Sequence, residues 1–153
     1  MKKTIIDLFE DSVVKYGAKT FLLEKKHRAF EPTTYAETRE QALETGAGLA
    51  AAGIRPGDKV AILSEGCTAW ITSELGVFYA GAVSVPLSVK LEESNDLLFR
   101  MRHAEVRALF VSKYQLSKIR RIRAELPQVE HIIVIGQDRK STRLNSSHNA
   151  QSR

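Results

Sequence analysis

The sequence predicts an α/β fold made of partial doubly wound βαβ layers, and three observations lead to this class. From Asp58 onward, four short apolar runs of strand length alternate with segments whose apolar residues recur at helical spacing. The runs are rich in β-branched residues, as is typical of strands buried on both faces. Turn residues such as Gly81 and Gly136 separate the two patterns. This alternation favours a parallel sheet with helices on its faces.

The expected elements follow from these periods and from the residues at their ends. The predicted strands are residues 20–23, 29–30, 60–63, 82–85, 108–111 and 131–135. The predicted helices begin at Thr4, Thr34, Thr68, Ser94 and after Ser112, and they end near Gly17, Ala52, Gly81, His103 and before Pro127. Residues 25–28 are basic and are predicted to form a solvated turn between the first two strands.

Two helix starts carry the residues of a capping box. Thr4 is followed by Asp7, and Thr34 by Glu37, so each hydroxyl can accept from the third helical N–H while the carboxylate accepts from the cap. The helix from Thr34 has a predicted inner face of mainly small residues, Leu43, Gly46, Ala47 and Ala50. Small residues on that face predict a close approach to a neighbouring element.

The remaining boundaries depend on single residues. Thr68 and Ser112 are expected to cap their helices through side-chain oxygens. Gly81 is expected to end the third helix in the left-handed conformation. Pro32 and Pro86 are expected to close the strands before them, because proline has no N–H to give to a ladder.

Length and composition fit one soluble domain. The chain has 153 residues, enough to bury a core, with 43% hydrophobic and 27% charged residues. No apolar run approaches the roughly 20 residues of a membrane span, and the start leads into an amphipathic helix instead of a signal core. A cytoplasmic setting is therefore predicted. Cys67 is the only cysteine, which excludes a disulfide framework and a cysteine-based metal site.

The net charge of +5 does not point to nucleic acid. Residues 138–153 hold four bases and one acid, so residues 1–137 hold 19 bases against 17 acids. That balance gives no electrostatic footprint for a nucleic-acid partner.

Residues 1–137 are predicted to form part of one domain, and residues 138–153 a disordered tail that is not native protein. Leu144 is the only large apolar residue in the tail, and the tail shows no periodicity. The tail also resembles peptides made when sequencing-adapter DNA is translated onto the end of a truncated gene.

Few residues are candidates for chemistry. Ser64 and Glu65 follow a predicted strand at its carboxyl end, where open α/β sheets bind ligands. Ordinary loop chemistry and helix capping are the favoured alternative. Cys67 has no histidine near it in sequence to act as a base, so an inert thiol is expected. The histidines considered for a metal site, which show no ligand spacing, are His27, His103 and His131.

Other patterns are expected to be structural. The basic run 118–123 could bind anionic lipid or nucleic acid, but Ile119 and Ile122 predict that its bases form a solvated outer helix face. Trp70 and Tyr79 are predicted core residues. The glycines at 46, 48 and 53 lie in or at the end of a helix, so they do not form a dinucleotide-binding loop.

Four segments carry a resemblance to a known family. They are Gly53-Ile-Arg-Pro-Gly-Asp-Lys-Val-Ala-Ile62, then Ser64-Glu65 with Trp70, then Leu75-Gly76, then Tyr79-Ala-Gly-Ala-Val-Ser-Val-Pro-Leu87. Together they resemble the N-terminal part of the AMP-forming acyl-CoA synthetases, which are adenylate-forming ligases, and the resemblance covers about residues 4–137. Many members have Ser-Glu-Asn where this chain has Ser64-Glu65-Gly66, and an acid where it has Ala69. The fold implied is part of the large N-terminal domain of these enzymes.

The resemblance implies an activity for the intact parent. A carboxylate attacks ATP to give acyl-AMP, and CoA then displaces AMP to give a thioester, with ATP, CoA and Mg²⁺ as cofactors. Segments 104–111, 122–127 and 132–135 most resemble the long-chain fatty acyl-CoA branch, which implies a fatty acid substrate. The remainder of the same domain is an expected partner, and peripheral membrane contact is a further possibility.

The residues that do chemistry in this family are expected to lie outside this chain. Its phosphate loop ending in Pro-Lys-Gly and its C-terminal lysine find no match in residues 1–153. We therefore assign no catalytic or metal-binding residue and no cofactor-binding residue, and we expect this chain alone to be inactive and to bind no cofactor tightly. The alternatives are a short-chain acid ligase, an amino-acid adenylation module, or a non-catalytic binding module.

Overall fold

The computed structural model describes residues 2–136, and the chain divides into two compact units. Unit 1 consists of Met1–Asp58 and Gly66–Ser84, and unit 2 of Lys59–Glu65 and Val85–Arg153. Unit 1 holds three helices and a hairpin, and unit 2 holds most of a sheet with parallel strands. The predicted α/β class is confirmed. The prediction for residues 138–153 lies outside the described residues.

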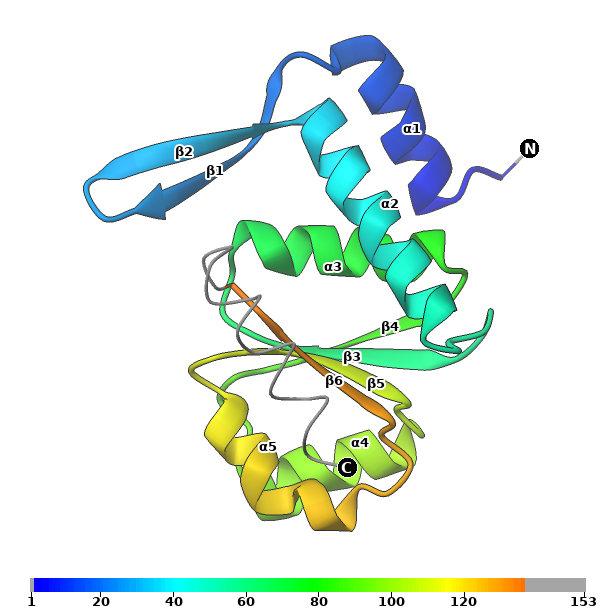
Figure 1. Cartoon of the computed structure of the whole chain (residues 1–153), viewed down its shortest axis with the longest axis vertical. Helices are drawn as coiled ribbons and strands as arrows, with labels where there is room; N and C mark the ends of the chain where they lie inside the picture. Colours follow the sequence, from blue (N-terminus) through cyan, green and yellow to red (C-terminus); the bar gives the residue numbers. More distant parts are fainter. Residues whose placement is uncertain (1, 137–153) are drawn as a thin grey trace. The chain divides into compact units, whose positions relative to one another are not determined.

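Unit 1 contains helices packed on one another and a two-stranded ribbon (Figure 1). Its elements are α1 (Ile5–Tyr16), β1 (Thr20–Lys26), β2 (Ala29–Thr34), α2 (Tyr35–Ala51) and α3 (Thr68–Tyr79). Strands β1 and β2 pair antiparallel. Phe9, Ala42 and Leu75 form the buried centre, and Ile71 and Phe78 pack against it. The predicted inward face of α3 is therefore confirmed.

Both predicted capping boxes are present. The Thr4 hydroxyl accepts from the Asp7 N–H at 3.1 Å, and the Asp7 carboxylate accepts from the Thr4 N–H at 2.8 Å. Thr34 and Glu37 make the same two bonds at 3.1 and 3.0 Å. Each box satisfies N–H groups that a helix start leaves without an intrahelical partner.

Helices α2 and α3 approach closely at two glycines. A Cβ on Gly46 would lie 2.9 Å from the Gly76 carbonyl oxygen, and a Cβ on Gly76 would lie 2.6 Å from the Thr45 Cβ. The close approach was predicted, but of the predicted inner face of α2 only Gly46 is buried. Its buried residues are Thr38, Ala42, Gly46 and Leu49. Ala47 and Ala50 are exposed, because the buried stripe follows i, i+4, i+8 and i+11.

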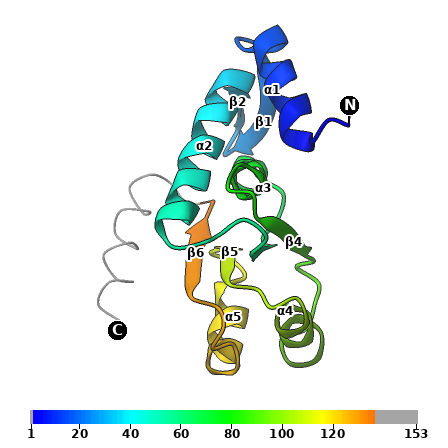
Figure 2. The same ribbon diagram turned by 90° about the vertical axis from the view of Figure 1, so that its right-hand side faces the viewer.

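Unit 2 has strands on one side and helices on the other. The strands are β3 (Lys59–Leu63), β4 (Val83–Leu87, which begins in unit 1), β5 (Ala108–Ser112) and β6 (His131–Ile135). The helical elements are the π-helical turn η1 (Glu93–Leu97), α4 (Leu98–His103), α5 (Leu116–Ile122) and the 3-10 turn η2 (Arg123–Glu125). In Figures 1 and 2, α4 and α5 lie on the same face of β3, β5 and β6.

The sheet has the strand order β4-β3-β5-β6. Strand β5 pairs parallel with β3 and with β6, and Val60 is level with Ala108. Residues 60–63 and 108–111 are all buried, which confirms two predicted buried strands, but the segment 82–85 was wrongly predicted to be buried, because it belongs to an outer strand on which Val83 is exposed. Under the sheet, Leu97, Met101 and Leu109 belong to one apolar cluster with Ile119 and Ile122. The predicted inward faces of these helices are therefore confirmed.

Two prolines lie inside strands, where the sequence predicted strand ends. Pro32 is level with Leu23 in the hairpin, and Pro86 is the fourth residue of β4. Each occupies an outer strand, where a missing N–H can face away from the ladder. Strand β1 also extends to Lys26, so the predicted turn at 25–28 is shorter. It is made by His27, at φ 55°, and Arg28.

Two predicted helix caps are wrong. Cys67, not Thr68, is the N-cap of α3, and it makes no side-chain cap bond. Ser112 belongs to β5, and Gln115 precedes α5. Gly81 does adopt the predicted left-handed conformation, with φ 71°.

The glycine contact between α2 and α3 predicts a position-specific stability effect. Gly76→Ala should lower the free energy of unfolding by about 1–3 kcal/mol, because the new methyl group would overlap Thr45. The matched control is Gly48→Ala, also within a helix, where nothing lies within 4 Å of the new Cβ. It should be neutral or stabilising by up to about 1 kcal/mol. Urea unfolding of both variants measures the difference, and equal effects would contradict the close approach.

Candidate functional site

The carboxyl ends of β3 and β5 form the place in unit 2 where a ligand site is expected. The two strands are neighbours, and Leu63 is level with Val111. From β3 the chain continues to β4 on one side of the sheet order, and from β5 to β6 on the other. Open α/β sheets bind ligands beyond the carboxyl ends at such a reversal. We call the polar residues at this edge the carboxyl-end cluster: Ser64, Glu65, Ser112, Gln115 and Lys118.

Hydrogen bonds engage the side chains of four of the five residues of the carboxyl-end cluster, whereas Ser112 Oγ and Gln115 Oε1 are buried without a partner among the described residues. Gln115 Nε2 donates to Glu65 Oε1 at 2.5 Å, which joins the loop after β3 to the segment after β5. Ser64 is buried, and its hydroxyl donates to the Glu65 carbonyl oxygen at 2.9 Å. Lys118 Nζ donates to the carbonyl oxygens of Val89 at 2.6 Å and Leu91 at 3.3 Å, in the connection after β4. These contacts link three connections of the sheet.

Electrostatics keep Glu65 ionised. Partial burial acts to raise the pKa of its carboxyl group, but the hydrogen bond from Gln115 and the nearby charge of Lys118 act in the opposite direction and outweigh burial. The pKa therefore lies below the ordinary value of 4.5. At neutral pH Glu65 is a hydrogen-bond acceptor for its neighbours and not a proton donor. This arrangement agrees with the predicted loop chemistry more than with a ligand role.

Basic residues of the run 118–123 bind to other groups of unit 2. Arg121 forms an ion pair with Glu93, and Arg123 donates to the carbonyl oxygens of Leu126 and Val129, both at 2.8 Å. With Lys118, three of its bases therefore hold loops and turns of their own unit. The predicted solvated face is confirmed for Arg121, which is exposed, whereas Lys118 and Arg123 are half-buried and donate to backbone carbonyl oxygens.

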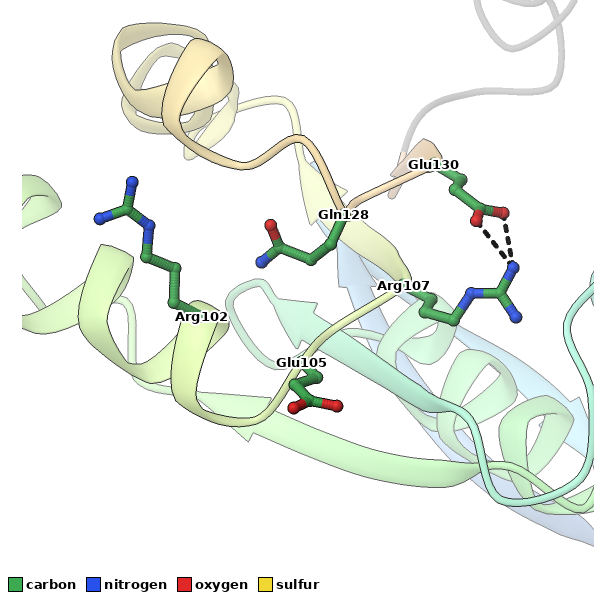
Figure 3. A pocket seen from close by; sticks show the side chains of 5 residues that line it. All are labelled: Arg102, Glu105, Arg107, Gln128 and Glu130. Atoms are coloured by element: carbon green, nitrogen blue, oxygen red, sulfur yellow. Dashed lines mark hydrogen bonds and ion pairs between the residues drawn. The ribbon is translucent and has the colours of Figure 1, made fainter.

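A hollow lies at the other end of the sheet (Figure 3). It has a volume of about 450 Å³ and is lined by Arg102, Glu105, Arg107, Gln128 and Glu130. Arg107 Nη2 donates to both carboxylate oxygens of Glu130, at 2.7 and 2.8 Å. The Arg107 N–H donates to the Lys59 carbonyl, and the Glu130 N–H donates to the Arg107 carbonyl. These bonds align the amino ends of β3, β5 and β6. Two of the residues that line the hollow therefore also hold neighbouring strands together.

The single-residue candidates do not combine into a catalytic group. Cys67 is half-buried at the start of α3, where the Thr68 N–H donates to Glu24 Oε1 at 3.1 Å. His27 lies in the hairpin turn, His131 begins β6, and His103 ends α4 with its ring stacked on Phe99 at 5.5 Å. Within residues 2–136, no three His, Cys, Asp or Glu side chains are placed to hold a metal.

Tyr79 combines core packing with a polar contact inside unit 1. Its ring packs against the apolar centre, and its hydroxyl donates to the Glu10 carboxylate. Arg39 Nε donates to the same carboxylate at 2.7 Å. Burial and the neighbouring Glu10 raise the pKa of Tyr79, so its hydroxyl keeps its proton and remains a donor. The contact ties α1, α2 and α3 together. Trp70, the other predicted core residue, is half-buried.

Sequence reasoning found only part of the carboxyl-end cluster. It identified Ser64 and Glu65, but it treated Ser112 as a cap and Lys118 as a surface base, and it did not consider Gln115. A usable signal was present, because polar residues follow two of the apolar runs, at 64–65 and at 112–115. Those positions meet only when β3 and β5 become neighbours.

Comparison with known proteins shows which family the chain matches. Residues 9–153 match the family model described as AMP-binding enzyme. A chloroplastic long-chain-fatty-acid–acyl-carrier-protein ligase from Arabidopsis thaliana is 28% identical over 109 residues, which is 71% of this chain and 15% of that protein. A long-chain-fatty-acid–CoA ligase from Thermus thermophilus is 28% identical over 129 residues, covering 84% and 24%.

A solved structure of a CoA ligase is similar to this chain in both fold and sequence. The anthranilate CoA ligase in complex with anthranoyl-AMP matches with a TM-score of 0.80 and 28% identity, over 87% of this chain and 25% of that one. The chain thus spans a quarter or less of the length of each of these proteins. No helix among the described residues is both long enough and apolar enough to span a membrane.

The low pKa of Glu65 predicts an acid-dependent loss of stability. Since the folded pKa lies below the ordinary value, the stabilisation is present above that value and is lost as the pH falls through the folded pKa. Between about pH 6 and about pH 3, the wild type should lose more unfolding free energy than Glu65→Gln, which cannot ionise. Glu125→Gln removes an exposed carboxylate of the same unit and should retain the wild-type pH slope. Identical slopes for wild type and Glu65→Gln in urea unfolding would refute this role.

Proposed function

The chain belongs to the AMP-binding enzyme family, and we propose that the intact protein is an ATP-dependent acyl-CoA ligase acting on long-chain fatty acids. The predicted resemblance to AMP-forming ligases is confirmed by the family match and by the named relatives. The observation that carries the long-chain proposal is the likeness to the Thermus thermophilus long-chain-fatty-acid–CoA ligase over 84% of this chain.

The proposed reaction has two steps. A fatty-acid carboxylate oxygen attacks the α-phosphorus of ATP, pyrophosphate leaves, and acyl-AMP forms. The sulfur of CoA then attacks the acyl carbonyl carbon, AMP leaves with the C–O bonding electrons, and the thioester forms. ATP, CoA and the fatty acid are the substrates in this proposal, and Mg²⁺ would neutralise phosphate charge when bound.

The described residues do not fit a Mg²⁺–ATP site, so we assign no step of the reaction to them. Glu65, the acid at the expected edge of the sheet, is engaged by Gln115, and Lys118 by two carbonyl oxygens. Residues 2–136 also contain no group of acids and histidines placed for a metal. In this proposal the chain supplies part of the scaffold, and the phosphate-binding and acyl-binding groups come from the rest of the protein.

A second candidate substrate is an aromatic carboxylic acid. The structure with a TM-score of 0.80 is an anthranilate CoA ligase, and it is as similar in sequence, at 28%, as the long-chain relatives are. Two further proposals are a cytoplasmic setting and peripheral membrane contact. Both would suit an enzyme that acts on fatty acids.

Acid-dependent exchange of pyrophosphate into ATP by the intact protein tests the proposal. Palmitate should support exchange at least about tenfold above acetate, anthranilate or any amino acid, a difference of about 1.4 kcal/mol in the barrier. Adding CoA should convert the palmitoyl adenylate to a thioester. Exchange with amino acids but not with palmitate would exclude a fatty acid substrate, and preference for anthranilate would favour the aromatic candidate.

A further inference from the structure

The loop that follows β3 leaves the sheet at the point where the strand order reverses. Strand β3 lies next to β5, while the chain runs from β3 outward to β4 and from β5 outward to β6. Open α/β sheets bind ligands beyond the carboxyl ends of the strands at such a reversal. The loop consists of residues 64–67, and Gly66 has no side chain that could pack and fix its backbone. The position of the loop therefore depends on the contacts of the neighbouring residues.

A side chain from the segment after β5 holds this loop. Gln115 Nε2 donates to Glu65 Oε1 at 2.5 Å, although the two residues are 50 positions apart in the chain. Hydrogen bonds to an ionised acceptor are shorter and stronger than those between neutral groups. Glu65 is such an acceptor at neutral pH, since the pKa of its carboxyl group lies below the ordinary value. The pair therefore joins the connections after two neighbouring strands through one strong contact.

Gln115 is itself fixed through its backbone. Its N–H donates to the Ser112 carbonyl at 3.1 Å, and its carbonyl accepts from the Lys118 N–H at 3.1 Å. These bonds hold it directly before α5, and α5 is anchored in the apolar core by Ile119 and Ile122, which are only 1% and 4% exposed. Groups near a binding site keep their geometry when rigid elements support them in this way.

The side chain of Lys118 holds a different connection of the sheet. Its Nζ donates to the carbonyl oxygens of Val89 and Leu91, at 2.6 and 3.3 Å, in the segment after β4. The start of α5 thus supports two connections through two separate side chains. A substitution of Gln115 should therefore release the loop 64–67 and leave the segment after β4 in place.

From this geometry we propose that Gln115 is a positioning residue of the intact enzyme, which holds Glu65 and thereby fixes the loop 64–67 at the edge of the sheet where the substrates bind. The inference rests on the proposed function. Gln115 contacts no reacting atom in this proposal, because its effect passes through the loop. The amide is suited to this role since it donates to the carboxylate. A carboxylate in its place would carry the same charge as Glu65 and would push the loop away.

Kinetics of acid-dependent pyrophosphate exchange by the intact protein test the proposal, with whichever carboxylic acid supports exchange. Gln115→Glu should lower kcat at least about tenfold, because a misplacement of about 1 Å can cost roughly a hundredfold in rate. The KM for ATP should change by less than about threefold. A role in stability alone would lower the unfolding temperature and leave kcat of the folded enzyme unchanged.

Exchange of the two side chains tests whether the effect passes through Glu65. The double variant Glu65→Gln with Gln115→Glu again places an amide against a carboxylate, so kcat should return to within about threefold of the wild type. Gln128→Glu is the matched control, since it makes the same substitution in unit 2 at the amino ends of the strands (Figure 3) and should leave kcat unchanged. If Gln115→Glu does not fold, Gln115→Met removes the donor without adding charge and should lower kcat about threefold or more.

Two results would overturn this inference while the proposed function stands. The first is an active wild type whose kcat is unchanged in Gln115→Glu, or in Gln115→Met where the glutamate variant does not fold. The second is a slow Gln115→Glu that the double variant does not restore. A wild type that shows no exchange with any carboxylic acid would instead overturn the proposed function, and this inference with it, before any variant is compared.

Discussion

The parallel register between β3 and β5 is the constraint on which unit 2 depends. Val60 through Leu63 lie level with Ala108 through Val111, and all of these residues are buried. A slip of one residue would send each side chain to the opposite face of the sheet. The same register brings the loop after β3 level with the segment after β5. The contact between Glu65 and Gln115 is therefore a consequence of strand pairing.

Polar side chains in both units are used to connect elements. At one end of the sheet Lys118 and Glu65 hold the connections, and at the other end Arg107 and Glu130 align the strand starts. In unit 1, Glu10 accepts from Arg39 and Tyr79 and so joins three helices. Burying a charge is costly unless it is paired and hydrogen-bonded, and these groups are. In these contacts the polar groups of each unit hold its own elements together, whereas Ser112 Oγ, Gln115 Oε1 and Gln128 Nε2 are buried without a hydrogen-bond partner within residues 2–136.

Local sequence predicted the elements well and their long-range partners poorly. The capping boxes at Thr4 and Thr34 and the apolar faces of α3 and α5 depend on residues a few positions apart, so spacing was sufficient. Pro86 was misjudged because only the strand order shows that β4 is an edge. Thr68 and Lys118 were misjudged because their partners, Glu24 and Val89, are distant in the chain. The carboxyl-end cluster was half found for the same reason.

The claim that this part of an AMP-binding enzyme is scaffold without its own chemistry is tested most directly by assaying the 153-residue chain for acyl-AMP. The folded chain would be incubated with ATP, Mg²⁺ and a fatty acid, and the adenylate measured by mass spectrometry. We expect no acyl-AMP above the level found without protein. ATP-dependent formation of acyl-AMP, abolished by heat denaturation of the chain, would show that these residues do carry catalytic groups and would contradict the claim.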